Sequence, residues 1–154
     1  FRLQNNGGLH RIFSPLNKKI SFKINQTFRE LTKNKKKDEK IIITKGRNFK
    51  INNFYEGITR FNFNDLCDVN LGGEDYINIA EFCNHIFIEN VPVFNENNSN
   101  QQLRFIILID IFYEKKISLS ISIEKDLKNL GSSKKHSEVF KRTLSRLYEM
   151  TKIN

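Results

Sequence analysis

One segment, residues 85–122, constrains the fold more than any other part of the sequence. A short apolar run at residues 86–88 ends at Glu89, and after a polar loop a dense apolar stretch extends over residues 103–113. A second β-rich run, residues 117–123, follows at once. Short runs bounded by turn signals on both sides of an apolar stretch of helical length predict strand, helix and strand. We therefore expect a parallel strand pair with a right-handed crossover.

Hydrophobic periodicity predicts the elements around this core. They are a strand at residues 11–13, a helix at 17–32, a solvated lysine loop at 33–40, strands at 40–44, 48–54 and 58–63, and helices at 74–84 and 137–151. Together these predict an α/β fold in a single unit, residues 1–154. It divides into an N-terminal strand, helix and basic loop (1–39), a small three-stranded antiparallel appendage (40–63) and an α/β core (64–154) that ends in a C-terminal helix.

Composition limits the class of protein. With 38% hydrophobic residues and 14 Phe, the chain is too apolar to be disordered, and its longest uncharged apolar stretch is too short to cross a bilayer. The chain begins without Met and in the middle of a pattern, so we expect a fragment of a longer protein. The net charge of +9, concentrated near Lys35–Lys37, could attract nucleic acid or anionic lipid. Lys and Asn are abundant throughout the sequence, however, which favours an ordinary solvated surface over a nucleic-acid site.

Four residues could suggest metal or redox chemistry, and none has the spacing for it. Cys67 and Cys83 lack the paired spacing of a zinc site, and we expect reduced, buried thiols in a cytosolic protein. A disulfide between them remains the alternative. His85 and His136 have no Cys or acid at metal-ligand spacing, so no metal site is predicted.

Several motifs together resemble one known family. They are FRL at residues 1–3, KGRNFKI at 45–51, FNFNDLCDVNLGGEDYINIAEFCNHIFIENVP at 61–92, QLRFIILIDIFYEKKISLSIS at 102–122 and FKRTLSRLYEM at 140–150. In this order and at these distances they resemble the C-terminal portion of ZapE/Afg-type AAA+ ATPases. These are bacterial cell-division ATPases and their mitochondrial relatives.

The resemblance implies the partners and cofactors of an intact protein. ATP and Mg²⁺ would be bound there, with an N-terminal ATPase half, a protein client such as the division ring, and a homo-oligomer as a further option. The implied location is cytoplasmic, including the periphery of the inner membrane or the division site, or mitochondrial in a eukaryote. The chain departs from the family pattern because it contains no GxxxxGK[ST] phosphate loop. By itself, it is therefore not expected to bind or hydrolyse ATP.

Two arginines of the last predicted helix are the candidate catalytic residues. Arg142 and Arg146 lie four apart, on one helix face. An AAA+ ATPase needs cations close to the γ-phosphate, because negative charge spreads over its oxygens during transfer. For Arg146 we weigh this sensing role equally with a structural salt bridge to Asp110 or Glu149, and for Arg142 we favour the structural role. Asp110 interrupts an apolar helix, so it needs a cation from another element, such as the terminal helix.

Three further charged residues are expected to serve structure or partner contacts. Glu89 follows an apolar strand, as a Walker B acid does, but without a phosphate loop we expect it to cap a loop or contact a partner. Arg104 lies on the helix of Asp110 and is too far round it to pair with that acid directly. Arg47 lies in an expected exposed turn, where it would contact a partner. Two rival functions remain, a non-catalytic protein-interaction module and a basic nucleic-acid-binding domain that uses residues 33–40.

Overall fold

A six-stranded mixed sheet runs through the part of the chain that the computed structural model describes, residues 10–153. In spatial order the strands are β1 (Ile12–Phe13), β6 (Ser118–Ile123), β5 (His85–Val91), β4 (Ile58–Asn62), β3 (Arg47–Tyr55) and β2 (Lys37–Thr44). The first four pair in parallel, whereas β3 pairs antiparallel with both β4 and β2. The FRL motif at residues 1–3 lies outside the described residues.

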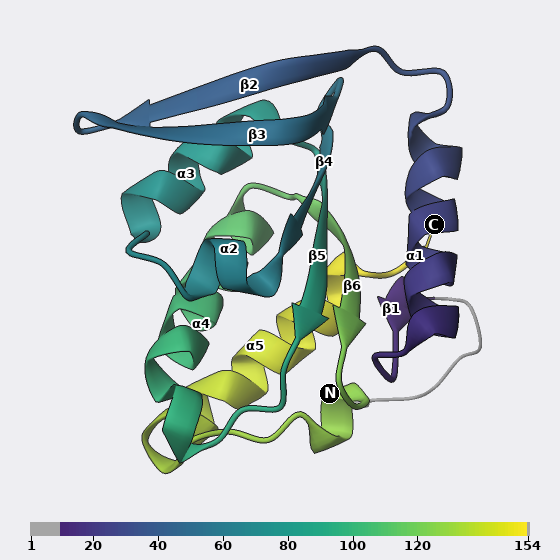
Figure 1. The fold of residues 1–154 in the computed structure, drawn as a ribbon. Coiled ribbons are helices and arrows are strands. Elements are labelled where there is room, and N and C mark those ends of the chain that lie inside the picture. The colour runs from purple at the N-terminus through teal and green to yellow at the C-terminus, as the bar shows by residue number, and fades with distance from the viewer. Residues whose placement is uncertain (1–9, 154) are drawn as a thin grey trace.

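Helices cover both faces of the sheet (Figure 1). They are α1 (Lys18–Thr32), α2 (Phe63–Cys67), α3 (Gly73–Phe82), α4 (Ser99–Glu114) and α5 (Ser137–Met150), with short 3-10 turns at Glu96–Asn98, Leu127–Asn129 and Lys134–His136. Ile24 and Phe28 of α1 pack on Ile58 and Phe87 on one face. The other four helices share a larger core on the opposite face. Among the helices of residues 10–153, none is both long and apolar enough to cross a membrane.

The predicted strand–helix–strand core is confirmed, since β5 and β6 pair in parallel and α4 connects them. The helix begins at Ser99, four residues earlier than expected, and its first turn includes the buried Gln102, whose side chain bonds the Ser133 backbone N–H and the Ser132 hydroxyl. Although its sequence is densely apolar, α4 is not buried on every side. Leu103 is exposed, because α3, α5 and the sheet leave that side of the helix to solvent.

The three strands of the expected appendage are present, but they belong to the same sheet as the core. β4 pairs in parallel with β5 along its whole length, so appendage and core are continuous. The prediction of a lysine loop before the strand at residues 40–44 is wrong for residues 37–39, which already belong to that strand. β2 begins at Lys37, which pairs with Tyr55 of β3. Charged side chains are well tolerated there because β2 is an edge strand whose outer side is solvated.

The two cysteines are free thiols and both are buried, as predicted. Burial raises the pKa of Cys67, and it raises the pKa of Cys83 to about 12. In the terminal helix the buried positions are Phe140, Thr143, Leu147 and Met150, and the partly buried Leu144 packs against the core. Val139 is exposed, whereas the neighbouring Phe140 is buried in the core.

Candidate functional site

A charged cluster lies where α4 packs against α5, and it contains both candidate arginines. Arg146 donates a hydrogen bond from Nη1 to Oδ1 of Asp110, and Arg142 reaches Oδ2 of the same acid at 3.4 Å. The guanidinium of Arg146 also lies 4.7 Å from the centre of the Tyr113 ring. The expected contact between Asp110 and the terminal helix is therefore present.

The local sequence explains why these groups meet. Arg142 and Arg146 are one turn apart on α5, and Asp110 and Tyr113 are three residues apart on α4, so each pair projects from one face of its helix. The Tyr113 hydroxyl donates to Glu149 at 3.0 Å, and this hydrogen bond raises the pKa of Tyr113. The two helices thus present one carboxylate between two guanidinium groups.

The side chains of the two arginines differ in solvent exposure, and this difference limits the role that each can have. The side chain of Arg146 is 22% exposed and that of Asp110 31%, whereas that of Arg142 is 58% exposed. A guanidinium has five N–H donors, and the hydrogen bond to Asp110 uses one of the donors of Arg146. Arg146 is therefore held in a fixed position with donors left over, which is what anion recognition requires.

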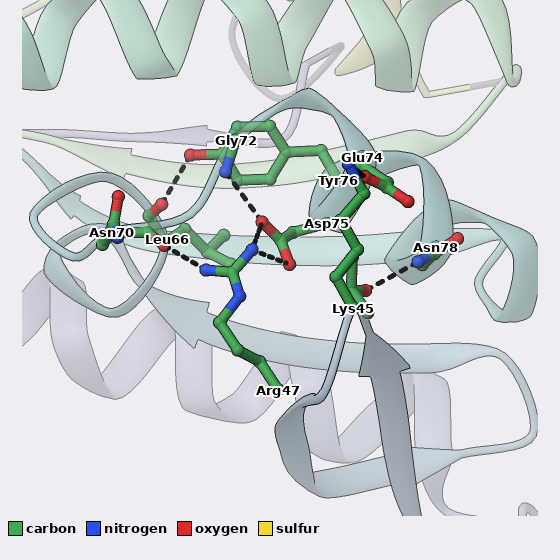
Figure 2. A network of polar contacts seen from close by, with 10 residues as sticks. Lys45, Arg47, Leu66, Asn70, Gly72, Glu74, Asp75, Tyr76 and Asn78 are labelled. Atoms are coloured by element: carbon green, nitrogen blue, oxygen red, sulfur yellow. Dashed lines mark hydrogen bonds and ion pairs between the residues drawn. The ribbon is translucent and has the colours of Figure 1, made fainter.

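A second polar network joins the β2–β3 hairpin to the start of α3 (Figure 2). Arg47 donates from Nη2 to both carboxylate oxygens of Asp75, at 3.1 and 2.9 Å, and from Nη1 to the Asn70 carbonyl. Asp75 also accepts from the Gly72 backbone N–H at 2.9 Å, at the positive end of α3. These three contacts, two from Arg47 Nη2 and one from the Gly72 N–H, supply polar partners to a carboxylate whose residue is only 4% exposed.

Arg47 is exposed, as expected, but it lies next to the hairpin turn rather than within it. The turn contains only Lys45 and Gly46, which have φ values of 45° and 79°, as a two-residue hairpin turn requires. Arg47 is consequently the first residue of β3. It opposes Thr44 on the face of the hairpin that α3 covers, where Thr44 bonds Asn78.

Glu89 is not a loop residue but lies within β5, where it pairs with Arg60 of β4. Arg60 donates from Nε at 2.7 Å and also from Nη2, and its Nη2 bonds Asn25 of α1 at 2.6 Å. The same guanidinium lies 4.9 Å from the Phe28 ring centre. Glu89 therefore helps to hold α1 on the sheet, and its charge is already balanced.

The remaining predicted residue, Arg104, donates to the Cys67 carbonyl at 3.2 Å and so ties α4 to the end of α2. His85 lies at the start of β5 and its Nε2 is 2.8 Å from the Ser120 hydroxyl. Burial, with a smaller contribution from Arg11, lowers the pKa of His85 to about 4. None of these contacts forms a nucleophile or metal site.

Sequence reasoning missed Arg60 and Asp75 as partners of Glu89 and Arg47. One signal was present for Arg60, which is the only charged residue in the strand Ile58–Asn62 and requires a buried or half-buried acid on a neighbouring strand. Parallel pairing of β4 with β5 brings it beside Glu89. No comparable signal pointed to the Arg47–Asp75 pair, because the two residues meet only when the hairpin folds over α3.

Comparison with known proteins gives the family. The AFG1-like ATPase family model matches residues 1–154. Lactation elevated protein 1 homolog B from Danio rerio is 29% identical over 109 residues, which are 70% of this chain and 22% of that protein. Cell division protein ZapE from Escherichia coli K12 is 33% identical over 88 residues, which are 57% of this chain and 24% of ZapE, and ZapE from strain O157:H7 gives the same values.

The matched region is thus less than a quarter of the length of each of these relatives. No solved structure matches the chain with statistical significance. The family match, in contrast, extends over every residue of the chain and confirms the resemblance carried by the motifs. This chain belongs to the AFG1-like ATPase family.

Proposed function

We propose that this chain is the C-terminal part of an ATP-hydrolysing protein, in which it couples ATP turnover to the remodelling of a protein client. The family match over residues 1–154 carries this proposal. The fold is compatible with it, because parallel strands joined by helices are the usual scaffold of nucleotide-binding domains. One relative is named as a cell division protein, which favours a client in the division machinery, such as the division ring, and a cytoplasmic site of action.

The binding site for ATP and Mg²⁺ is proposed to lie in another part of the intact protein. The sequence contains no GxxxxGK[ST] motif. Within residues 10–153, no group of three or more His, Cys, Asp or Glu side chains could hold a metal ion. Glu89, the acid with a Walker B-like position, is neutralised by Arg60. We therefore assign the phosphate loop and the metal ligands to the remainder of the intact protein.

Arg146 is the residue of this chain that we propose to act on the nucleotide. Bound ATP with Mg²⁺ would supply the phosphoryl group that is transferred to water. Arg146 would donate hydrogen bonds to the γ-phosphate oxygens and stabilise their negative charge. Asp110 and Tyr113 would hold the guanidinium in place, and Arg142 would act as a structural partner of Asp110.

A second candidate is a non-catalytic interaction module. It is favoured by the outer face of the edge strand β2, where Ile41 and Ile43 are 54% and 68% exposed. Such apolar side chains beside an unpaired strand edge are suited to contact with another protein. In this case, the chain would bind the client and the rest of the protein would do all the chemistry.

Separate measurements of ATP hydrolysis and client binding distinguish the two functions. ATP turnover should be present in the full-length protein, absent from residues 1–154 alone, and reduced when the α4–α5 cluster is altered. Absence of hydrolysis by the full-length protein would refute the proposal. Normal turnover after alteration of the cluster, together with loss of client binding after Ile41→Ser and Ile43→Ser, would support the interaction module instead.

A further inference from the structure

Residues 18–37 carry a concentrated positive charge that the fold does not use. This segment contains eight Lys or Arg residues and a single acid, Glu30. All eight basic side chains are exposed. Four of these basic residues lie in α1 and Lys33 is its C-terminal cap, whereas the other three lie in the connection to β2 or at its first residue.

The packing of α1 fixes which side of the helix faces solvent. Ile24 and Phe28 are buried against the sheet, and Asn17 caps the N-terminus by accepting from the Ile20 backbone N–H at 2.8 Å. With 3.6 residues per turn, the opposite side presents the basic residues Lys18, Lys19, Lys23, Arg29 and Lys33. Phe22, which is 60% exposed, projects from the middle of this basic face.

The cations of this face have almost no partners in the protein. Within residues 10–153, no ion pair involves Lys18, Lys19, Lys23 or Arg29, and Lys33 is 3.9 Å from Glu30 in a fully solvated pair. The structural arginines differ clearly, since Arg47, Arg60 and Arg146 are each bonded to an acid. A row of unpaired cations on one helix face is suited to an anionic partner outside the chain.

We propose that the outer face of α1 binds the surface of an anionic lipid bilayer. The helix has 15 residues and is roughly 22 Å long, so it can lie flat with several lysines at the headgroups at once. A basic helix with one exposed aromatic ring is typical of interfacial binding, in which the ring enters the headgroup region. This activity would be independent of the proposed ATP hydrolysis.

Other occupants fit this face less well. Single-stranded nucleic acid is usually held by several aromatic rings that stack on successive bases, and here Phe22 is the one aromatic residue of the outward face. A second copy of the chain, with its net charge of +9, would be repelled. α1 covers the sheet face opposite to α4 and α5 (Figure 1), so binding to a bilayer would leave Asp110 and Arg146 accessible.

Sedimentation with lipid vesicles tests the proposal on the full-length protein. We expect binding to vesicles of phosphatidylcholine and phosphatidylglycerol, weak binding to phosphatidylcholine alone, and dissociation as salt is raised. The triple variant K18E/K19E/K23E should bind at least about tenfold more weakly. The matched control K125E/K128E/K135E has the same change in charge at exposed positions outside α1 and should bind like the wild type.

The variant Phe22→Trp gives an independent signal, because residues 1–154 contain no Trp. Its additional fluorescence should shift to shorter wavelength with anionic vesicles and should not shift with neutral ones. Equal binding to both vesicle types would overturn the proposal, as would equal losses in the two triple variants or an unshifted spectrum. Binding of a single-stranded oligonucleotide or poly-glutamate through the same lysines, without vesicle binding, would assign the surface to that partner instead.

Discussion

Arg47 binds Asp75 through both carboxylate oxygens, and this pair joins the tip of the β2–β3 hairpin to the first turn of α3. Further polar links of the hairpin tip are the bond from Arg47 to the Asn70 carbonyl, the Thr44–Asn78 bond and an exposed pair between Lys45 and Glu74. Asp75 is nearly inaccessible to solvent, so its carboxylate oxygens find their hydrogen-bond partners in Arg47 and the Gly72 N–H. The clamp therefore positions the hairpin relative to the helical face of the sheet.

Arg47→Ala should lower the free energy of unfolding by about 2 kcal/mol. Removal of the arginine side chain leaves a buried carboxylate with one fewer partner. The expected decrease in the free energy of unfolding stays below the roughly 3–5 kcal/mol of a fully buried pair, because half of the arginine side chain is solvated. Urea denaturation measures the change. Lys50→Ala is the matched control, since its pair with Glu39 is exposed, and it should change stability by no more than about 0.5 kcal/mol. Equal losses in the two variants would contradict the clamp.

Two glycines with nearly the same φ should lose very different amounts of stability when they are replaced by alanine. Gly46 has φ +79° and no neighbouring atom within 4 Å of an added Cβ, so Gly46→Ala should cost only about 1 kcal/mol of left-handed strain. Gly131 has φ +77°, but its Cβ would lie 2.5 Å from the Phe94 carbonyl oxygen, where the two segments form a bridge. Gly131→Ala should therefore cost about 3 kcal/mol or more. Similar melting temperatures for both variants would argue against this close approach.

His85 should make the fold less stable in mild acid. Because burial lowers its folded-state pKa to about 4 from an unfolded value near 6.5, the unfolded chain binds the proton first. The contribution of His85 to stability is therefore complete above pH 6.5 and decreases as the pH falls towards 4. Between pH 7 and pH 5 the loss should be about 2 kcal/mol. The variant His85→Gln should lose less stability over this interval, and an identical pH dependence would show that His85 is not the group responsible.

The sequence was most informative where one hydrophobic pattern extends over a whole helix or strand. The apolar runs of β5 and β6 and the stretch from Phe105 to Phe112 predicted the parallel core, because their patterns allow few other arrangements. The start of β2 was missed, because Lys37 and Asp38 look like loop residues until β3 supplies strand partners for them. For the same reason, the continuity of the hairpin with the core could not be recognised from local pattern.

The contacts of the candidate site also differ in how far the sequence predicted them. The contact between Asp110 and the terminal helix was predictable, because a carboxylate in an apolar helix needs a cation and the two arginines are one turn apart on the helix expected to cap the core. Two other pairs depend on tertiary packing between residues that are distant in the sequence. Arg47 and Asp75 are 28 positions apart, and Arg60 and Glu89 are 29 positions apart. The first pair requires the hairpin to fold over α3, and the second requires β4 to pair with β5.

Steady-state ATP hydrolysis by the full-length protein with Arg146→Ala tests the proposed role of Arg146 most directly. Loss of a donor to the developing phosphate charge should lower kcat by about a hundredfold or more, at a temperature where circular dichroism shows the variant to be folded. Lys141→Ala, on the exposed side of the same helix, should keep the wild-type rate. If Arg146→Ala turns over ATP at the wild-type rate and loses only as much stability as Asp110→Asn, then Arg146 is a structural salt-bridge residue and the proposed role is wrong.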